Sequence, residues 1–327
     1  MYICHIVPSR SGKIPIFVSR QISSLEKIGL KGTIIQFDVT KFSLRYILTL
    51  YRNIKNVALK NEKVIIHGHW GSLLSLVCIL IAPRQSKIII TFRGSDINRS
   101  PFDPLLQSVT RRIFSNVAAN FADKIILVNE QLASSFFLKP TNYSVVLDGV
   151  DTDVFFPINQ KEARAKLGWD NCKIFLFFYA GTQPEVKGIN LIETSFEMVQ
   201  KVFGEQIELV IVNEGVSAKR MNLMLNGSDL LLFASPFEGS PNIIREAITT
   251  GLRVVSVDVA DCKKWITLTS HGMIVDYKSS EFADAILCML KKKRKTKENI
   301  EKFLQEVSLD VSAEKLKNIY YELENND

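Results

Sequence analysis

The 327-residue sequence predicts an α/β protein built from two doubly wound domains, and three features lead to this fold class. Short apolar runs rich in β-branched residues alternate along the whole chain with segments whose apolar residues recur at helical spacing. Continuous apolar strands that alternate with helices are typical of parallel sheets covered by helices on both faces. A polar stretch without a strand pattern, residues 148–172, separates the runs into two groups. We therefore expect one sheet on each side of this stretch.

The first group contains six candidate strands and the second contains five, and helices are expected between them. Residues 15–29 and 188–204 both have apolar residues at helical spacing and both end in glycine, as helices often do. The longest apolar stretch, residues 72–83, is too short to span a bilayer, which takes roughly 20 apolar residues, so we expect a buried helix there. The candidate strands are residues 2–7, 33–37, 63–67, 87–92, 124–128 and 143–147, followed by 173–181, 207–212, 229–235, 253–258 and 273–277.

The composition excludes several classes of protein. A hydrophobic content of 46% and a charged content of 23% are those of a globular protein, not of a disordered or fibrous one. The five cysteines are scattered and form no CxxC pair, so we expect neither a disulfide framework nor a zinc site, and a reducing cytosol is the natural compartment. The N-terminus lacks a basic segment before a long apolar core, and we interpret it as a first strand and not as a signal peptide.

The net charge of +7 favours anionic partners such as phosphates or an anionic membrane surface. The densest basic run extends from Lys291 to Lys297. Two interpretations of this run stay open, a solvated helix end or a surface that faces a membrane. Nucleic acid is not an expected partner, because no nucleic-acid-binding motif accompanies the charge.

Residues 237–251, which directly follow a candidate strand, predict a phosphate site at a helix start. Ser240 fits the N-cap of this helix, Pro241 its first position and Gly251 the position just past its end. The start of a helix binds phosphate through its free backbone N–H groups and its dipole together. Here those groups would belong to Asn242 and Ile243.

Three charged side chains surround this expected helix start. Glu238 lies in the loop before it, and Glu246 lies one turn beyond Asn242 on the same face. The helix dipole fades within the first turn, so Glu246 gains little from it, whereas a carboxylate is an efficient acceptor for vicinal hydroxyls. Lys187 opens another helix, where a cation is disfavoured unless an anion lies nearby. A phosphate with hydroxyl-rich groups on either side describes a nucleotide sugar.

Residues 233–259, FASPFEGSPNIIREAITTGLRVVSVDV, resemble the donor-site signature of glycosyltransferase family 4, retaining enzymes of the GT-B fold also described as glycosyl transferases group 1. The family pattern has two glutamates separated by seven residues, an alanine after the second, and then a Gly-x-x-Val-Val segment. The resemblance covers nearly the whole chain. The other matching segments are residues 1–12, 64–70, 91–96, 145–157, 179–188 and 310–323.

The resemblance implies two Rossmann-like domains with parallel sheets that face an interdomain cleft. Residues 1–157 would form the acceptor-side domain, 158–310 the donor domain, and 311–327 a closing helix that packs towards the first domain. The implied activity is transfer of a hexose-type sugar, with retention, from a UDP- or GDP-linked donor to a glycan or lipid-linked glycan in surface polysaccharide biosynthesis. No metal or other cofactor is expected. The expected location is the cytoplasm, at the inner face of an anionic membrane.

The resemblance also implies roles for single residues. Glu246 would bind the ribose hydroxyls, and Glu238 would bind the hydroxyls of the transferred sugar. Lys187 would neutralise the diphosphate as it becomes the leaving group, which is where such an enzyme gains most of its rate. Lys187 and Glu238 are therefore the expected catalytic residues. The other expected donor-site residues are Gly12, Thr182, Gly239, Ser240, Asn242 and Ile243.

The sequence departs from the family pattern at three places. Thr182 stands where the family has an arginine, and Arg10 or Lys13 could supply the missing positive charge. Arg93 stands where the family has a histidine, so it would bind sugar or phosphate oxygens, with Asp96 orienting the acceptor. Only 51 positions separate Lys187 from Glu238, fewer than usual, which predicts a second sheet that lacks one strand–helix unit.

Two histidines at a strand end, His67 and His69, have two open interpretations. They could line the cleft as acceptor-site groups, with His69 the better candidate, or they could make structural hydrogen bonds. A zinc site is not expected without further ligands. His5, which alternates within the first strand, is interpreted as a core residue.

Two alternatives to a transferase stay open. A nucleotide-sugar epimerase of the same fold would bind the same donor, but it needs acid and base groups near the sugar that we cannot locate. A degenerate GT-B scaffold without activity would have no reason to keep Lys187, Glu238 and Glu246 together. No acid–base pair is assigned, as expected if the departing phosphate helps to deprotonate the acceptor.

Overall fold

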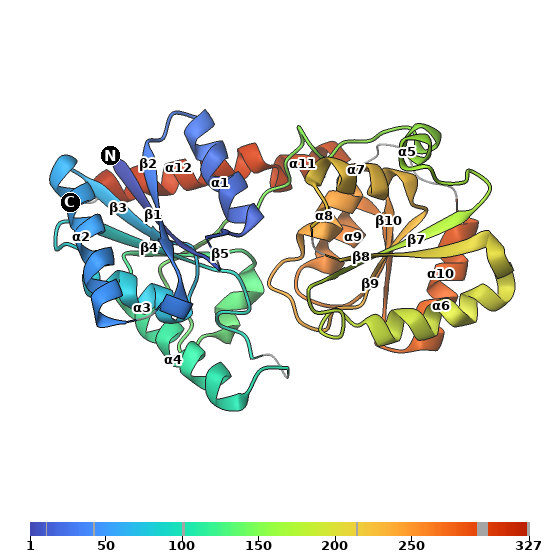
Figure 1. The fold of residues 1–327 in the computed structure, drawn as a ribbon, viewed down its shortest axis with the longest axis horizontal. Helices are drawn as coiled ribbons and strands as arrows, with labels where there is room; N and C mark the ends of the chain where they lie inside the picture. The colour runs from blue at the N-terminus through green and yellow to red at the C-terminus, as the bar shows by residue number, and fades with distance from the viewer. Residues whose placement is uncertain (11, 42, 100–101, 214, 293–299, 326–327) are drawn as a thin grey trace. The chain divides into compact units, whose positions relative to one another are not determined.

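The computed structural model describes residues 1–10, 12–41, 43–99, 102–213, 215–292 and 300–325. The chain folds into two compact units (Figure 1). The N-terminal unit comprises Met1–Gly149 and Leu309–Asp327, and the C-terminal unit comprises Val150–Ser308. The division falls earlier than the sequence-based boundary at residue 157, because the Val150 N–H donates to the carbonyl of Val307 (2.8 Å) and ties the crossing segment into the C-terminal unit.

The N-terminal unit has a six-stranded parallel sheet in the order β2-β1-β3-β4-β5-β6. Helices α2, α3 and α4 pack against one face, and α1 and α12 pack against the other. The strands are β1 (Tyr2–Pro8), β2 (Gly32–Phe37), β3 (Val64–Gly68), β4 (Lys87–Phe92), β5 (Lys124–Leu127) and β6 (Tyr143–Val145). The helices are α1 (Ile16–Lys27), η1 (Val39–Lys41), α2 (Leu44–Lys60), α3 (Ser72–Ile81), α4 (Leu105–Phe121), η2 (Glu130–Ser135) and α12 (Leu309–Asn325).

The C-terminal unit has a five-stranded parallel sheet in the order β11-β10-β9-β7-β8. Helices α6 and α10 pack together over one face. The strands are β7 (Ile174–Gly181), β8 (Ile207–Asn213), β9 (Leu230–Phe233), β10 (Arg253–Val257) and β11 (Gly272–Val275). The helices are α5 (Gln160–Leu167), α6 (Ile189–Phe203), η3 (Gly204–Gln206), α7 (Ala218–Gly227), α8 (Asn242–Thr249), α9 (Cys262–Thr269), α10 (Ser279–Lys291) and α11 (Ile300–Val307).

The structure confirms the expected fold class and all eleven expected strands. The polar stretch 148–172 contains helix α5 and no strand of either sheet. The first sheet has six strands and the second has five, the numbers that the sequence predicts. Among the described residues, no helix combines the length and the apolar character that crossing a bilayer requires. Most of the lysine-rich run lies outside the described residues, so its two interpretations stay as they are.

Candidate functional site

The helix whose start the sequence predicts to bind phosphate is present, but its capping differs from the prediction. Helix α8 begins at Asn242, and Pro241 occupies the N-cap position without a side-chain cap. The prediction that Ser240 caps this helix is therefore wrong. The Ser240 hydroxyl instead donates to Asp261 Oδ2 (2.7 Å) and accepts a hydrogen bond from Arg245. Because a short helix leaves its first N–H groups without intrahelical partners, the start of α8 still offers donors to an anion.

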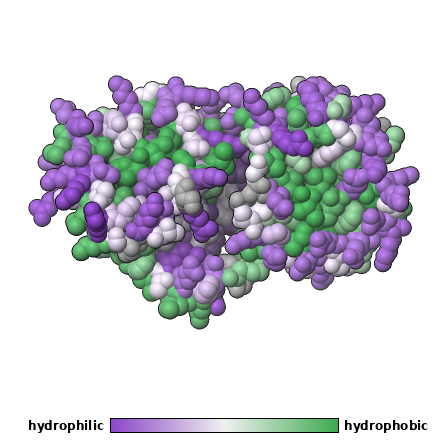
Figure 2. Space-filling model, in the orientation of Figure 1, coloured by the Kyte–Doolittle hydropathy of each residue, from purple (hydrophilic) through white to green (hydrophobic). Residues whose placement is uncertain are grey.

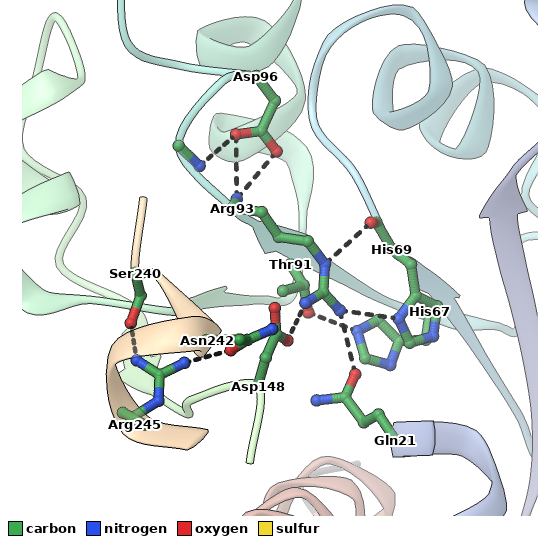
Figure 3. A network of polar contacts seen from close by, with 11 residues as sticks. Gln21, His67, His69, Thr91, Arg93, Asp96, Asp148, Ser240, Asn242 and Arg245 are labelled. Carbon is green, nitrogen blue, oxygen red and sulfur yellow. Dashed lines mark hydrogen bonds and ion pairs between the residues drawn. The ribbon is translucent and has the colours of Figure 1, made fainter. Parts of the chain in front are cut away.

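A buried arginine that the sequence analysis missed holds this helix start in place (Figure 3). Arg245 is fully buried within α8 and donates to Ser240, to the side-chain oxygen of Asn242 and to Asp261 Oδ2 (3.3 Å). The indole N–H of Trp265 donates to the same carboxylate oxygen (2.7 Å). Burial lowers the pKa of Arg245, and the neighbouring carboxylates of Asp261 and Glu246 partly oppose this shift. The loop before α8, α8 itself and α9 are thus fixed to one another.

The two expected catalytic residues lie side by side in the C-terminal unit. Lys187 Nζ lies 2.6 Å from Glu238 Oε1, and the two side chains are 28% and 16% exposed. Gly188 makes this approach possible, because its φ is +83° and a Cβ there would lie 2.4 Å from the carbonyl oxygen of Ala234. The chain before α6 therefore packs directly against the end of β9, and only glycine fits at position 188.

The other residues expected at the donor site of the C-terminal unit differ in exposure. Thr182 is exposed directly after the end of β7, whereas Gly239 and Ile243 are buried. Glu246 is 9% exposed within α8. The segments expected to bind the donor thus follow the carboxyl ends of β7 and β9, where open α/β sheets bind ligands.

The glycine loop of the N-terminal unit forms a tight turn after β1. Arg10 and Lys13 exchange both backbone hydrogen bonds (3.1 and 2.9 Å), and Gly12 between them has a φ of +77°. This conformation favours glycine. The side chains of Arg10 and Lys13 are exposed on either side of the turn.

The three residues expected on the acceptor side lie together in the N-terminal unit, but all are buried (Figure 3). Arg93 forms an ion pair with Asp148, and its guanidinium also donates to Gln21 Oε1 (3.2 Å) and to the carbonyl of His69 (3.3 Å). Each of the three guanidinium nitrogens therefore donates to a protein group. Burial lowers the pKa of Arg93 to about 9. In this structure Arg93 is held by protein groups and does not present a free guanidinium to sugar or phosphate oxygens.

Asp96 holds a loop instead of facing an acceptor. It is fully buried, and its carboxylate accepts hydrogen bonds from the backbone N–H groups of Gly71 (2.8 Å), Arg93 (3.0 Å) and Gly94 (2.9 Å). Burial raises the pKa of Asp96, although these three donors oppose the shift. The expectation that Asp96 orients the acceptor has no support in this geometry, because no part of the side chain is exposed.

A third histidine joins the two histidines found from the sequence. His5 Nδ1 lies 2.9 Å from His69 Nε2, and one nitrogen of each of His5, His67 and His69 lies within 4.8 Å of the others, a spacing that could hold a metal ion. However, the ring nitrogens of His67 are both hydrogen bonded already, to Tyr320 Oη (2.7 Å) and Thr91 Oγ1 (2.7 Å). The cationic Arg93 also lies 3.5 Å from His69 Nδ1. These contacts favour the structural interpretation of all three histidines.

We expect the protein to lose stability as the pH falls below about 6.5, where exposed histidines take up a proton. Burial lowers the pKa of His5 to about 3, and burial with neighbouring positive groups lowers the pKa of His67 and His69 well below the usual value. The unfolded chain then binds more protons than the folded protein, so the free energy of unfolding falls with pH. His5 alone contributes about 1.4 kcal/mol per pH unit between about 6.5 and 3.

Urea unfolding at pH 7.5, 6.5 and 5.5 measures this dependence, with His5→Gln as the comparison. The variant is less stable at pH 7.5, because it loses a buried hydrogen bond, but its stability falls less steeply with pH. Equal slopes for the two proteins would contradict the assignment of the pH dependence to the histidines.

Two family models match the chain, one in each unit. The model described as glycosyl transferase 4-like matches residues 2–129, and the model described as glycosyl transferases group 1 matches residues 199–292. A search of curated protein sequences finds no match. The chain thus belongs to the glycosyltransferases that these two models describe, as its donor motif indicates.

Solved structures with the same fold include three whose names bear on function. Sucrose-phosphate synthase from Thermosynechococcus elongatus is 14% identical, with a TM-score of 0.81 over 100% of both chains. HepE from Anabaena in complex with UDP-glucose is 14% identical, with a TM-score of 0.74 over 98% of this chain and 100% of that one. UDP-GlcNAc 2-epimerase from Methanocaldococcus jannaschii is 15% identical, with a TM-score of 0.58 over 98% and 99%. The fold is therefore GT-B, and the chain is a glycosyltransferase of the GT-B type.

Proposed function

We propose that this protein is a retaining hexosyltransferase that takes a hexose-type sugar from a UDP- or GDP-linked donor and transfers it to a glycan or lipid-linked glycan. The acceptor would be a growing surface polysaccharide, built in the cytoplasm at the inner face of the membrane. The observation that carries the proposal is the Lys187–Glu238 ion pair beside the start of α8. It combines a cation, a carboxylate and helix N–H donors at the carboxyl ends of β7 and β9.

The pair suits a site that binds a nucleotide sugar. In the free protein each side chain neutralises the other. When the donor binds, Lys187 would turn to the diphosphate, and Glu238 would then accept hydrogen bonds from the sugar hydroxyls. Glu246, one turn into α8, would accept hydrogen bonds from the ribose hydroxyls. The donor thus replaces one ion pair with two sets of charge-assisted hydrogen bonds.

In the proposed reaction the bond between the anomeric carbon and the phosphate oxygen breaks, and the nucleoside diphosphate leaves with the electron pair. The acceptor oxygen bonds to the anomeric carbon on the same face of the sugar, and its proton goes to the departing phosphate. Lys187 and the N–H groups at the start of α8 stabilise the negative charge that develops on the leaving group. Because these groups supply positive charge, we propose that no metal ion is required.

A panel of nucleotide sugars, each incubated with the protein, tests this function. Since the HepE structure contains UDP-glucose, this donor is the natural first choice. We expect release of free nucleoside diphosphate from one donor, faster with an acceptor present, and unchanged by EDTA. Release of nucleoside diphosphate from no donor would overturn the proposal. Conversion of the donor to its epimer, without sugar transfer, would identify the epimerase alternative.

A further inference from the structure

The outer surface of helices α2, α3 and α4 in the N-terminal unit has an unusual distribution of charge. These three helices contain no aspartate or glutamate. On α2 the side chains of Arg45, Arg52, Lys55 and Lys60 are exposed, and α4 adds the half-buried Arg112. The second arginine of α4, Arg111, is paired with Asp103 just before the helix (2.5 Å). The charged residues within these helices are therefore all basic, whereas a solvated surface commonly mixes charges of both signs.

The same surface exposes large apolar side chains. On α4, Leu105, Val109, Ile113, Val117 and Phe121 follow one another at a spacing of four residues and are 38–68% exposed. Figure 2 shows hydrophobic surface at the tip of the N-terminal unit where α4 lies. The other exposed apolar side chains of this layer are Leu44, Leu48, Tyr51 and Leu59 on α2, Leu80 on α3, and Leu106 on α4.

A short segment after η2 extends the apolar surface beside α4. Phe137 and Leu138 are 58% and 79% exposed. The backbone N–H of Phe137 donates to the side chain of Asn116 (2.7 Å), and the guanidinium of Arg112 lies 5.2 Å from the Phe137 ring. The segment is therefore fixed to α4, and a cation stands directly beside an exposed aromatic ring.

We propose that this outer surface of α2, α3 and α4, with Phe137 and Leu138, binds a lipid bilayer rich in anionic lipids. Exposed apolar side chains on helices whose charged residues are all basic match the boundary between anionic headgroups and acyl chains. A second copy of this chain fits less well, because two such surfaces would meet with charges of the same sign. The inference rests on the proposed function, because membrane binding through this surface would bring the protein to a lipid-linked acceptor.

Sedimentation with vesicles of phosphatidylglycerol and phosphatidylcholine tests the inference. We expect the protein to bind vesicles that contain phosphatidylglycerol and not vesicles of phosphatidylcholine alone. The variant Arg45→Glu/Arg52→Glu/Lys55→Glu should bind at least ten-fold more weakly. The matched control Lys161→Glu/Lys201→Glu/Lys219→Glu changes three exposed lysines of the C-terminal unit, and so lowers the net charge equally, yet it should bind like the original protein.

The apolar contribution needs its own variant. Val109→Ser/Ile113→Ser keeps every basic residue, and both side chains are exposed, so the fold should persist. It should also bind at least ten-fold more weakly, and far-ultraviolet circular dichroism verifies its folding. Vesicle binding that weakens equally in the surface triple variant and in the C-terminal control would overturn the proposal. So would vesicle binding that is unchanged in both the surface triple variant and Val109→Ser/Ile113→Ser. A third contrary result would be that the original protein binds no vesicles and is a dimer by light scattering, while Val109→Ser/Ile113→Ser is a monomer. The surface would then be an interface between two copies of the chain.

The nucleotide-sugar panel, run without lipid, keeps this inference separate from the proposed function. Donor turnover by the triple variant at the level of the original protein, with weaker vesicle binding, supports the docking surface alone. Vesicle binding by a protein that releases nucleoside diphosphate from no donor would leave the docking surface in place and reject the proposed transferase.

Discussion

Replacing Lys187 with methionine is expected to lower kcat about 10²–10³-fold, as removal of a donor that stabilises developing negative charge commonly does. Methionine has a similar length but no charge. In the free protein Lys187 Nζ pairs with Glu238 (2.6 Å) at the start of α8, and we expect it to transfer to the diphosphate when the donor binds. Steady-state release of nucleoside diphosphate, measured over a range of donor concentrations, gives kcat and KM separately.

Lys187→Arg is the matched control, because it keeps the charge. It should retain more activity than the methionine variant, although its planar group cannot copy the point charge of lysine. The free energy of unfolding should change by only about 1 kcal/mol in either variant, since the ion pair is partly exposed. Full turnover by Lys187→Met would show that this lysine does not face the leaving group.

Glu246→Ala should weaken binding of the free nucleoside diphosphate about 10–100-fold, which is the size expected for losing charge-assisted hydrogen bonds to hydroxyls worth about 1.5–3 kcal/mol. The side chain is 9% exposed, one turn into α8, where it is too far from the helix start to serve the phosphate. Isothermal titration calorimetry with UDP and GDP measures this loss directly.

Glu238→Ala is the comparison for Glu246→Ala, because Glu238 should bind the transferred sugar and not the nucleotide. It should bind the nucleoside diphosphate nearly as well as the original protein but turn over the donor more slowly. If the two variants have the same effect on binding and turnover, the separate roles given to these glutamates are wrong.

Most of the fold follows from the sequence, because strands buried on both faces must be continuous apolar runs. The start of α8 shows where this reasoning ends. A serine followed by proline is a sound local signal for an N-cap, yet the Ser240 hydroxyl is used by Asp261 and Arg245. Those partners are set by how α8 and α9 pack, which local sequence does not reveal.

The histidines show a similar limit. The sequence points to His67 and His69 because both lie at the end of one strand. His5 lies in another strand, so its contact with them depends on the order of strands in the sheet. β1 lies beside β3 in a register that sets His5 opposite His67. The order and register of the strands would have indicated that His5 lies beside His67. The resemblance to GT-B proteins predicts the fold but not this register. Likewise, the burial of Arg93 depends on Asp148 and Gln21, which are distant in sequence.

A crystal structure of the protein with UDP bound is the decisive measurement for the proposed donor site. We expect the diphosphate to lie within hydrogen-bond distance of the first N–H groups of α8 and of Lys187 Nζ, which has moved away from Glu238. We also expect the ribose hydroxyls to donate to the carboxylate of Glu246. A nucleotide bound elsewhere, with the Lys187–Glu238 pair still closed at 2.6 Å, would contradict the proposed function.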